Sequence, residues 1–350
     1  MEPSFSANLA PDCAYDTDAS GACQMSRHLL IDTDPGIDDA LAILLALSSC
    51  EAQVETITTV AGNVPVDLAT ANARRILAVA APDPMPRLAR GAEAPLKGPL
   101  VTAAHFHGDD GLGHLDRLVD PDGRPRYPAP SIPLETRPGA EAILDTVDRR
   151  GPELTIVALG PLTNLAAALA LDAARLARAA RVVVMGGAIA VPGNVTAAAE
   201  FNIHVDPEAA AMVFASGLPI ELIPLDVTRR VVLDEATLVE RLRRSASTTS
   251  RFILDFTGHG FSFEAERQSR GMALHDPLAM AVALDPSLVT FERLSIRVEC
   301  ESRLTRGLTM ADRLTSPAGR PAPPTCRVAL DVDAERALGS ILEGLCPASA

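Results

Sequence analysis

The stretch DTDPGIDD, residues 32–39, directly follows the apolar run HLLI, residues 28–31. This pattern predicts that a buried strand ends here and that a helix begins. Ligands of open α/β proteins bind at this carboxyl edge of the sheet. Acids so close together repel each other unless a cation or the hydroxyls of a sugar engage them, and a hard, oxygen-liganded cation such as Ca²⁺ or Mg²⁺ is the expected occupant. The acids are Asp32, Asp34, Asp38 and Asp39.

Strand-like runs alternate with helix-like runs through the first two thirds of the chain. The expected strands are His28–Asp34, Val54–Ala61, Leu154–Leu159, Arg181–Met185 and Leu218–Leu225. The expected helices are Asp38–Ser48, Leu68–Ala81, Ala140–Arg149 and Leu162–Leu171. Because continuous apolar strands between helices are typical of a parallel sheet covered on both faces, the pattern predicts the α/β class, with a mostly parallel central sheet flanked by helices.

The last third of the chain is less regular. The expected helices are Leu233–Asp255, Arg251–Glu266 and Asp276–Leu284, and Leu294–Glu299 with Val328–Val332 form a possible edge pair of strands. The chain has no internal repeat and no long linker, so we expect one domain over residues 28–345, preceded by a loose polar tail of residues 1–27.

Composition narrows the class of protein. The 350 residues carry a formal net charge of −14, which disfavours a nucleic-acid partner because phosphate binding needs a basic face. No apolar stretch reaches the ~18 residues that span a bilayer. The six cysteines are scattered without a CxxC pair, which is typical of reduced thiols. We therefore expect a cytoplasmic protein that binds a small molecule and has no membrane partner.

Amide and carboxylate residues follow other predicted strands. Asn63 ends the second strand in AGN, although an Asn after Gly is more often part of a turn. Glu200 and Asn202 alternate with Phe201, so both could face one cleft and hold the hydroxyls of a sugar, or form an amphipathic edge strand.

Two further segments carry histidines. In LHDP, Asp276 opens a predicted helix beside His275 and could complete a metal site, or serve only as a helix cap. The loop HFHGDDGLG, residues 105–113, contains His107 and could close over a ligand or stay solvated.

Together these segments resemble the inosine-uridine preferring nucleoside hydrolases. The matching segments, in chain order, are DTDPGIDDALAILLAL, TTVAGN, HGDDGLG, LGPLTNLA, VVVMGGA, GNVTAAAEFNIHVDPEAA, LDVT and HDPLAMA. The resemblance covers the chain from about residue 28 to about residue 335, and the first segment is highly specific. The resemblance implies a Rossmann-type open sheet and hydrolysis of the N-glycosidic bond of ribonucleosides to ribose and free base.

The resemblance also assigns site residues. It implies that Ca²⁺ is bound by Asp34, Asp39, Asp276 and the backbone carbonyl of Leu159. It implies that the substrate is bound by Asp38, Asn63, His107, Met185, Asn194, Glu200 and Asn202. Asp34 would activate the water that attacks the anomeric carbon, and His275, with His259 as second candidate, would protonate the leaving base. Members of this family are commonly homodimers or homotetramers, so we expect a homo-oligomer.

Several alternatives stay open at this point. The chain has no Trp and two Tyr, so the base pocket, expected within residues 252–270, favours a pyrimidine or broad preference over stacking of purines. A non-catalytic ribose- or nucleoside-binding protein and a hydrolase of another N-riboside are compatible with the same motifs. A DxD phosphotransferase is less so, because Pro35 and Gly36 follow the second Asp.

Overall fold

The computed structural model describes residues 27–346 except 129, 244, 246, 314–322 and 324. Residues 1–26 of the expected tail lie outside the described residues, and Arg27 already belongs to the first strand. Among the described residues, no helix has both the length and the apolar character needed to cross a bilayer.

Nine strands in the described part of the chain form one sheet, in the order β10-β9-β11-β6-β5-β4-β1-β2-β3. In this order, the neighbouring strands from β11 through β6, β5, β4, β1 and β2 to β3 are parallel. Strand β9 is antiparallel to both β11 and β10. The mostly parallel α/β sheet is therefore confirmed. The strands are β1 (Arg27–Thr33), β2 (Ala52–Thr59), β3 (Arg87–Arg90), β4 (Leu154–Ala158), β5 (Arg181–Met185), β6 (Ile220–Ile223), β9 (Val289–Val298), β10 (Thr309–Asp312) and β11 (Cys326–Val332).

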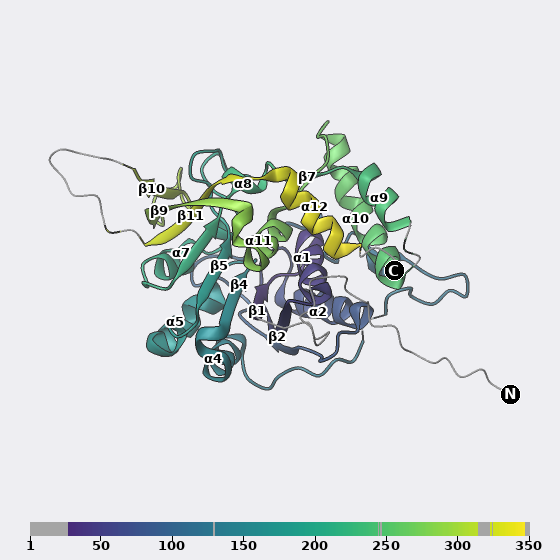
Figure 1. The fold of residues 1–350 in the computed structure, drawn as a ribbon, viewed down its shortest axis with the longest axis horizontal. Helices are drawn as coiled ribbons and strands as arrows, with labels where there is room; N and C mark the ends of the chain where they lie inside the picture. Colours follow the sequence, from purple (N-terminus) through teal and green to yellow (C-terminus); the bar gives the residue numbers. More distant parts are fainter. Residues whose placement is uncertain are drawn as a thin grey trace, which may run out of the picture.

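Helices cover both faces of this sheet (Figure 1). One face packs against α1 (Ile37–Ser48), α2 (Val66–Ala80), α10 (Thr248–Glu266), α11 (His275–Leu284) and α12 (Ala334–Leu345). The other packs against α4 (Gly139–Arg150), α5 (Thr163–Leu176) and α7 (Pro207–Phe214). Short elements are α3 (Ala104–His107), α6 (Phe201–Val205), α8 (Leu225–Thr228), α9 (Glu235–Arg243) and the 3-10 helices Leu115–Arg117, Gly151–Glu153 and Pro286–Leu288. A separate two-stranded antiparallel sheet pairs β7 (Val232–Leu233) with β8 (Met272–Ala273), which follows α9 and α10 in the chain.

Strand β1 shows why the central strands are apolar throughout. Leu29 and Ile31 point into the core on the α1 side, whereas Leu30 points into the core on the α5 side. All three are fully buried. Successive side chains of a strand point to opposite faces, and burial of each Leu or Ile contributes about 1.5–3 kcal/mol. The same alternation continues at the polar end of the strand, where Asp32 points towards α5 and Thr33 towards α1.

Two expectations for the last third need correction. Leu233–Asp255 is not one helix, because Asp234 accepts a hydrogen bond from the amide of Thr237 and Ser247 accepts one from the amide of Ser250. Each bond caps the start of a new helix, α9 and α10. The expected strand pairing does form, between β9 and β11, but β10 covers β9 and is itself the edge strand.

The strand order places the ends of β1 and β4 at a special position. From β3 to β6 the order is 3-2-1-4-5-6, so the direction of the connections reverses between β1 and β4. In open α/β sheets this switch point forms a crevice at the carboxyl ends of the strands. Asp34 follows β1 and Leu159 follows β4. These are two of the positions that the sequence nominated for a site.

Candidate active site

The turn between β1 and α1 is built around the carboxylate of Asp39. Asp39 accepts hydrogen bonds from the Thr33 hydroxyl at 2.5 Å, the Gly36 amide at 2.9 Å and Asn63 Nδ2 at 3.0 Å. The first two bonds close the turn and the third ties it to the end of β2. The buried acid is thus held by local donors at the N-terminus of α1, where negative charge is favoured.

Asp34 is held in place from both sides. Its Oδ2 accepts a hydrogen bond from the Asn63 amide at 2.6 Å. A Cβ on Gly62 would collide with this carboxylate, and one on Gly160 would lie 2.5 Å from Asp34 Oδ1. Glycine at both positions allows the loops after β2 and β4 to close around the acid. Asp34 Oδ1 is buried without a hydrogen-bond partner in the described structure, so this oxygen remains available to a ligand.

Four aspartates form what we call the acid cluster: Asp34, Asp38, Asp39 and Asp276. Carboxylate oxygens of Asp38, Asp39 and Asp276 lie within 4.8 Å of one another. Burial raises the pKa values of Asp34 and Asp276 well above the usual range of an aspartate, and the neighbouring carboxylates add to this effect. The same two causes raise the pKa of Asp38 to about 7. Ionised acids this close need a compensating cation, and an all-oxygen donor set suits Ca²⁺.

Glu200 and Asn202 hold the backbone beside this cluster. The alternative of an amphipathic edge strand is wrong, because Glu200 caps helix α6. Its carboxylate accepts hydrogen bonds from the amides of Asn202, Ile203 and Gly187. Asn202 Nδ2 donates to the carbonyl oxygen of Leu159 at 2.6 Å. Both residues nevertheless line one cavity, as expected from the sequence.

Two of the three nominated histidines reach the cavity. His107 Nδ1 accepts a hydrogen bond from the Ile37 amide at 3.0 Å, and burial lowers the pKa of His107 to about 3. His275 Nδ1 lies 2.7 Å from the Thr228 hydroxyl, and burial, followed by the charge of Arg229, lowers the pKa of His275 to about 4. Both rings are therefore neutral near pH 7.

His259 is placed elsewhere. Its ring packs edge-on against His114 at 4.7 Å between centroids, and it does not belong to the described residues that line the cavity.

The cavity has a volume of about 320 Å³ and gathers most of the nominated residues. The nominated residues on its walls are Asp38, Asn63, His107, Leu159, Met185, Asn194, Glu200, Asn202, His275 and Asp276. Asp34 and Asp39 do not line it themselves but bond to Asn63, which does. Segments more than 200 residues apart in sequence thus meet at the switch point of the sheet.

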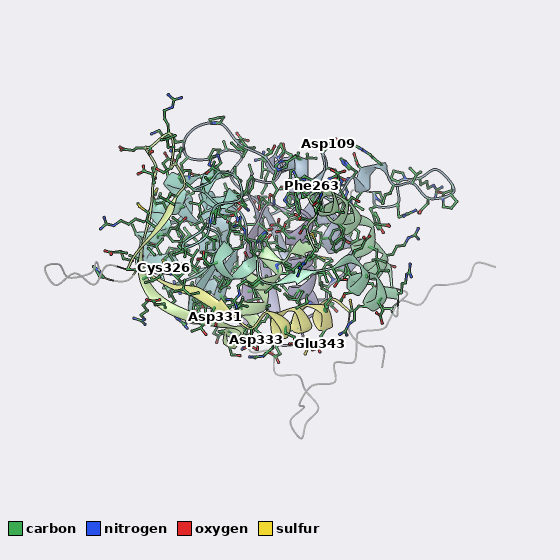
Figure 2. All side chains as sticks on the ribbon, turned by 90° about the horizontal axis from the view of Figure 1, so that it is seen from above. Asp109, Phe263, Cys326, Asp331, Asp333 and Glu343 are labelled. Carbon is green, nitrogen blue, oxygen red and sulfur yellow. The ribbon has the colours of Figure 1, made fainter. Side chains whose placement is uncertain are left out.

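A second group of lining residues, which we call the aromatic wall, comes from α3 and the end of α10. Its members are His105, Phe106, Phe263, Glu264 and Arg267. The Arg267 guanidinium lies 3.4 Å from the centre of the Phe263 ring, and Phe106 meets the same ring edge-on at 5.1 Å. Figure 2 shows Phe263 on the side of the molecule away from α12, which carries Glu343.

Part of the aromatic wall could be predicted from the sequence. Phe263, Glu264 and Arg267 all lie within residues 252–270, the segment expected to meet the base, whereas Phe106 was not singled out from the sequence. Arg267 follows the last residue of α10, so the helical pattern did not include it.

Asp32, grouped with the other acids by sequence, has a different position. Its Oδ1 accepts hydrogen bonds from Thr58 at 2.5 Å and from Asn164 at 2.7 Å, inside the sheet and away from the cavity. Burial raises the pKa of Asp32 to about 6. Its bonds tie β1 to β2 and to α5, which indicates a structural role.

Comparisons with known proteins identify the family of this chain. The family model for the inosine-uridine preferring nucleoside hydrolase matches residues 29–339. An inosine-uridine preferring nucleoside hydrolase of Crithidia fasciculata is 34% identical over 92% of this chain and 98% of its own length. A pyrimidine-specific ribonucleoside hydrolase RihA of a Shewanella species is 38% identical over 88% and 93%.

Solved structures give the same result. A purine-preferring ribonucleoside hydrolase from Gardnerella vaginalis superposes with a TM-score of 0.82 at 33% identity, over 91% of this chain and 98% of that one. A plant nucleoside hydrolase superposes with a TM-score of 0.83 at 34% identity, over 92% and 99%. This chain therefore belongs to the inosine-uridine preferring nucleoside hydrolase family and is an N-ribosyl hydrolase that cleaves the N-glycosidic bond of ribonucleosides.

Proposed function

We propose that this hydrolase depends on Ca²⁺ and that Asp34 is the general base that activates the attacking water. The observation that carries the proposal is the buried Asp34 Oδ1, which has no partner among the described residues and belongs to the acid cluster. A buried polar atom without a partner costs free energy, which a ligand or a water would recover.

The donor set fits a calcium ion. Asp34, Asp39, Asp276 and the Leu159 carbonyl would hold it, and all four supply oxygen. The Leu159 carbonyl already accepts one hydrogen bond from Asn202, but a carbonyl oxygen has a second lone pair. When bound, such a cation lowers the pKa of a coordinated water and orients it.

The remaining steps of the reaction fall to side chains of the protein. Asp34 takes the proton of the water as the water attacks the anomeric carbon. The carboxylates of Asp38 and Glu200 stabilise the positive charge that develops on the ribose as the glycosidic bond breaks. Asn63 and Asn202 would bind ribose hydroxyls. Deoxyribose leaves such buried polar groups without partners, so we expect it to be rejected.

The groups that face the leaving base are fewer and less specific than those proposed to bind the ribose. A neutral His275 is suited to donate a hydrogen bond to the departing base, whereas its lowered pKa makes transfer of a full proton harder. The flat faces of Phe106 and Phe263 and the donors of Arg267 suit a nucleobase with carbonyl groups. We therefore propose a pyrimidine or broad base preference, with other N-ribosides as the alternative substrates.

Release of reducing sugar tests this proposal. The panel is uridine, cytidine, inosine, adenosine, guanosine and deoxyuridine, each with and without a Ca²⁺ chelator. We expect ribose release that chelation abolishes and added Ca²⁺ restores, with deoxyuridine refused. Release that persists in chelator would overturn the calcium dependence. No release from any ribonucleoside, in protein shown to contain calcium, would move the proposal to another N-riboside.

A further inference from the structure

Helix α8 and the residue after it hold a loop that reaches the cavity. Residues 186–199 connect the end of β5 to Glu200, the cap of α6. Two members of this loop, Asn194 and Val195, line the cavity. The Asn194 side chain also accepts a hydrogen bond from the amide of Phe201 at 2.9 Å, so the position of Asn194 is coupled to the start of α6.

Two side chains from the α8 segment fix this loop by its backbone. Asp226 accepts hydrogen bonds from the amides of residues 189 and 190, both at 2.8 Å. Arg229 donates through its two terminal nitrogens to the carbonyls of residues 192 and 193, both at 2.8 Å. The second contact directly precedes Asn194 in the chain. Only a guanidinium presents two donors in a fixed fork, so lysine would not reproduce both bonds.

The loop has little freedom to find another route. A Cβ on Gly193 would collide with the carbonyl of Ala199, so the two arms of the loop already lie in close contact. The amides of residues 193–196 bond within the loop, to the carbonyls of Ala197 and Ala199. The loop is therefore a compact unit whose placement depends on what ties it to the rest of the protein, and Arg229 ties it at the turn that carries Asn194.

We propose that Arg229 is a positioning residue for sugar binding, which acts through the loop of residues 186–199 and not by touching the substrate. Arg229 itself is outside the set of described residues that line the cavity. The same helix also places Thr228 against His275, so one short segment orients groups on both the sugar side and the leaving-group side. This inference rests on the proposed function and on the substrate-binding role that the family resemblance implies for Asn194, which lines the cavity beside Glu200 and Asn202.

The variant Arg229→Met tests the proposal, with Arg230→Met as its matched control. Arg230 is the next residue, and it pairs with Asp331 at 2.6 Å without contacting the loop. For Arg229→Met we expect KM for uridine or inosine at pH 7 to rise about 10-fold, equivalent to the loss of one substrate hydrogen bond. We expect kcat to change little, because burial is the larger cause of the lowered pKa of His275 and keeps that ring neutral at pH 7 without the charge of Arg229. Arg230→Met should keep the values of the wild type, and Arg229→Lys should fall between.

Hydrogen exchange gives a readout that needs no turnover. Amides of residues 188–199 should exchange faster in Arg229→Met than in Arg230→Met, while those of β4 stay protected in both and report an intact fold. Unchanged exchange in the loop, or faster exchange with KM unchanged, would overturn the positioning role. A wild type that releases no ribose would overturn the proposed function alone, because ribose binding by calorimetry and the exchange comparison remain measurable.

Discussion

The acid cluster and the aromatic wall meet in one cavity but are built in different ways. Asp34 and Asp39 lie at strand and helix ends and are fixed by backbone amides and by close glycines. Phe263 and Arg267 come from the end of one helix, and Arg267 is exposed. The first region cannot shift without disturbing the sheet, whereas the second can change side chains at little structural cost. This difference suits a fixed reaction on ribose combined with an adaptable choice of base.

The largest effect should come from Asp34→Asn. The amide keeps an oxygen for the Asn63 amide but cannot take a proton from water. With Ca²⁺ added in excess and bound calcium measured in both proteins, because Asp34 is also a proposed calcium ligand, we expect kcat to fall about 10³-fold, within the range that general bases contribute, with nucleoside binding retained. Steady-state kinetics measures kcat, and calorimetry measures nucleoside binding.

Asp32→Asn is the control for that change, because Asp32 is equally buried but bonds only within the fold. It should retain kcat within about 3-fold, since an amide oxygen can still accept from Thr58 and Asn164. Equal losses in the two variants would mean that Asp34 contributes structure and not base catalysis.

Gly160→Ala tests whether the close packing around Asp34 matters. The new Cβ would lie 2.5 Å from Asp34 Oδ1, so the carboxylate must move. We expect kcat to fall about 10²-fold, since small displacements of a catalytic group have effects of this size. Gly258→Ala is the matched control, because nothing lies within 4 Å of its Cβ and alanine favours the helix. Full activity in Gly160→Ala would show that the acid tolerates displacement.

His107 joins the two regions, because it lies on α3 yet accepts a hydrogen bond from the Ile37 amide at the start of α1. The folded protein keeps it neutral with a pKa of about 3, against about 6.5 in an unfolded chain. The unfolded chain therefore binds more protons below pH 6.5, and the stability that His107 contributes is complete above that pH and is lost as pH falls towards 3.

His107→Asn should remove this dependence while keeping an acceptor for Ile37. Between pH 7 and pH 5, the difference in unfolding free energy between wild type and variant should narrow by about 2 kcal/mol. Urea unfolding of both proteins in chelator measures it, because the acid cluster then titrates alike in each. A difference that stays constant with pH would mean that folding does not lower the pKa of His107.

The acid cluster could be predicted from sequence and the aromatic wall largely could not. Asp34 and Asp39 are close in sequence and follow a strand, so local pattern alone brings them to the sheet edge. The alternation of Glu200 and Asn202 with Phe201 is compatible with an edge strand, whereas the Glu200 carboxylate in fact caps a helix. Arg267 gains its role only when α10 docks beside α3, and that contact between distant helices leaves no periodic signal in the sequence.

The smallest effect should come from the aromatic wall itself, through Arg267→Ala. Arg267 stacks on Phe263 at the surface, so its loss should leave stability nearly unchanged. We expect kcat/KM to fall up to about 10-fold for bases with carbonyl groups, uridine and inosine, and less for adenosine. Refusal of deoxyuridine should persist, because the acid cluster and its neighbours bind the sugar.

Arg270→Ala, three residues further along, is the control. An equal loss on every base would mean that the wall only encloses the substrate, and a loss of sugar discrimination would mean that the two regions are not separate.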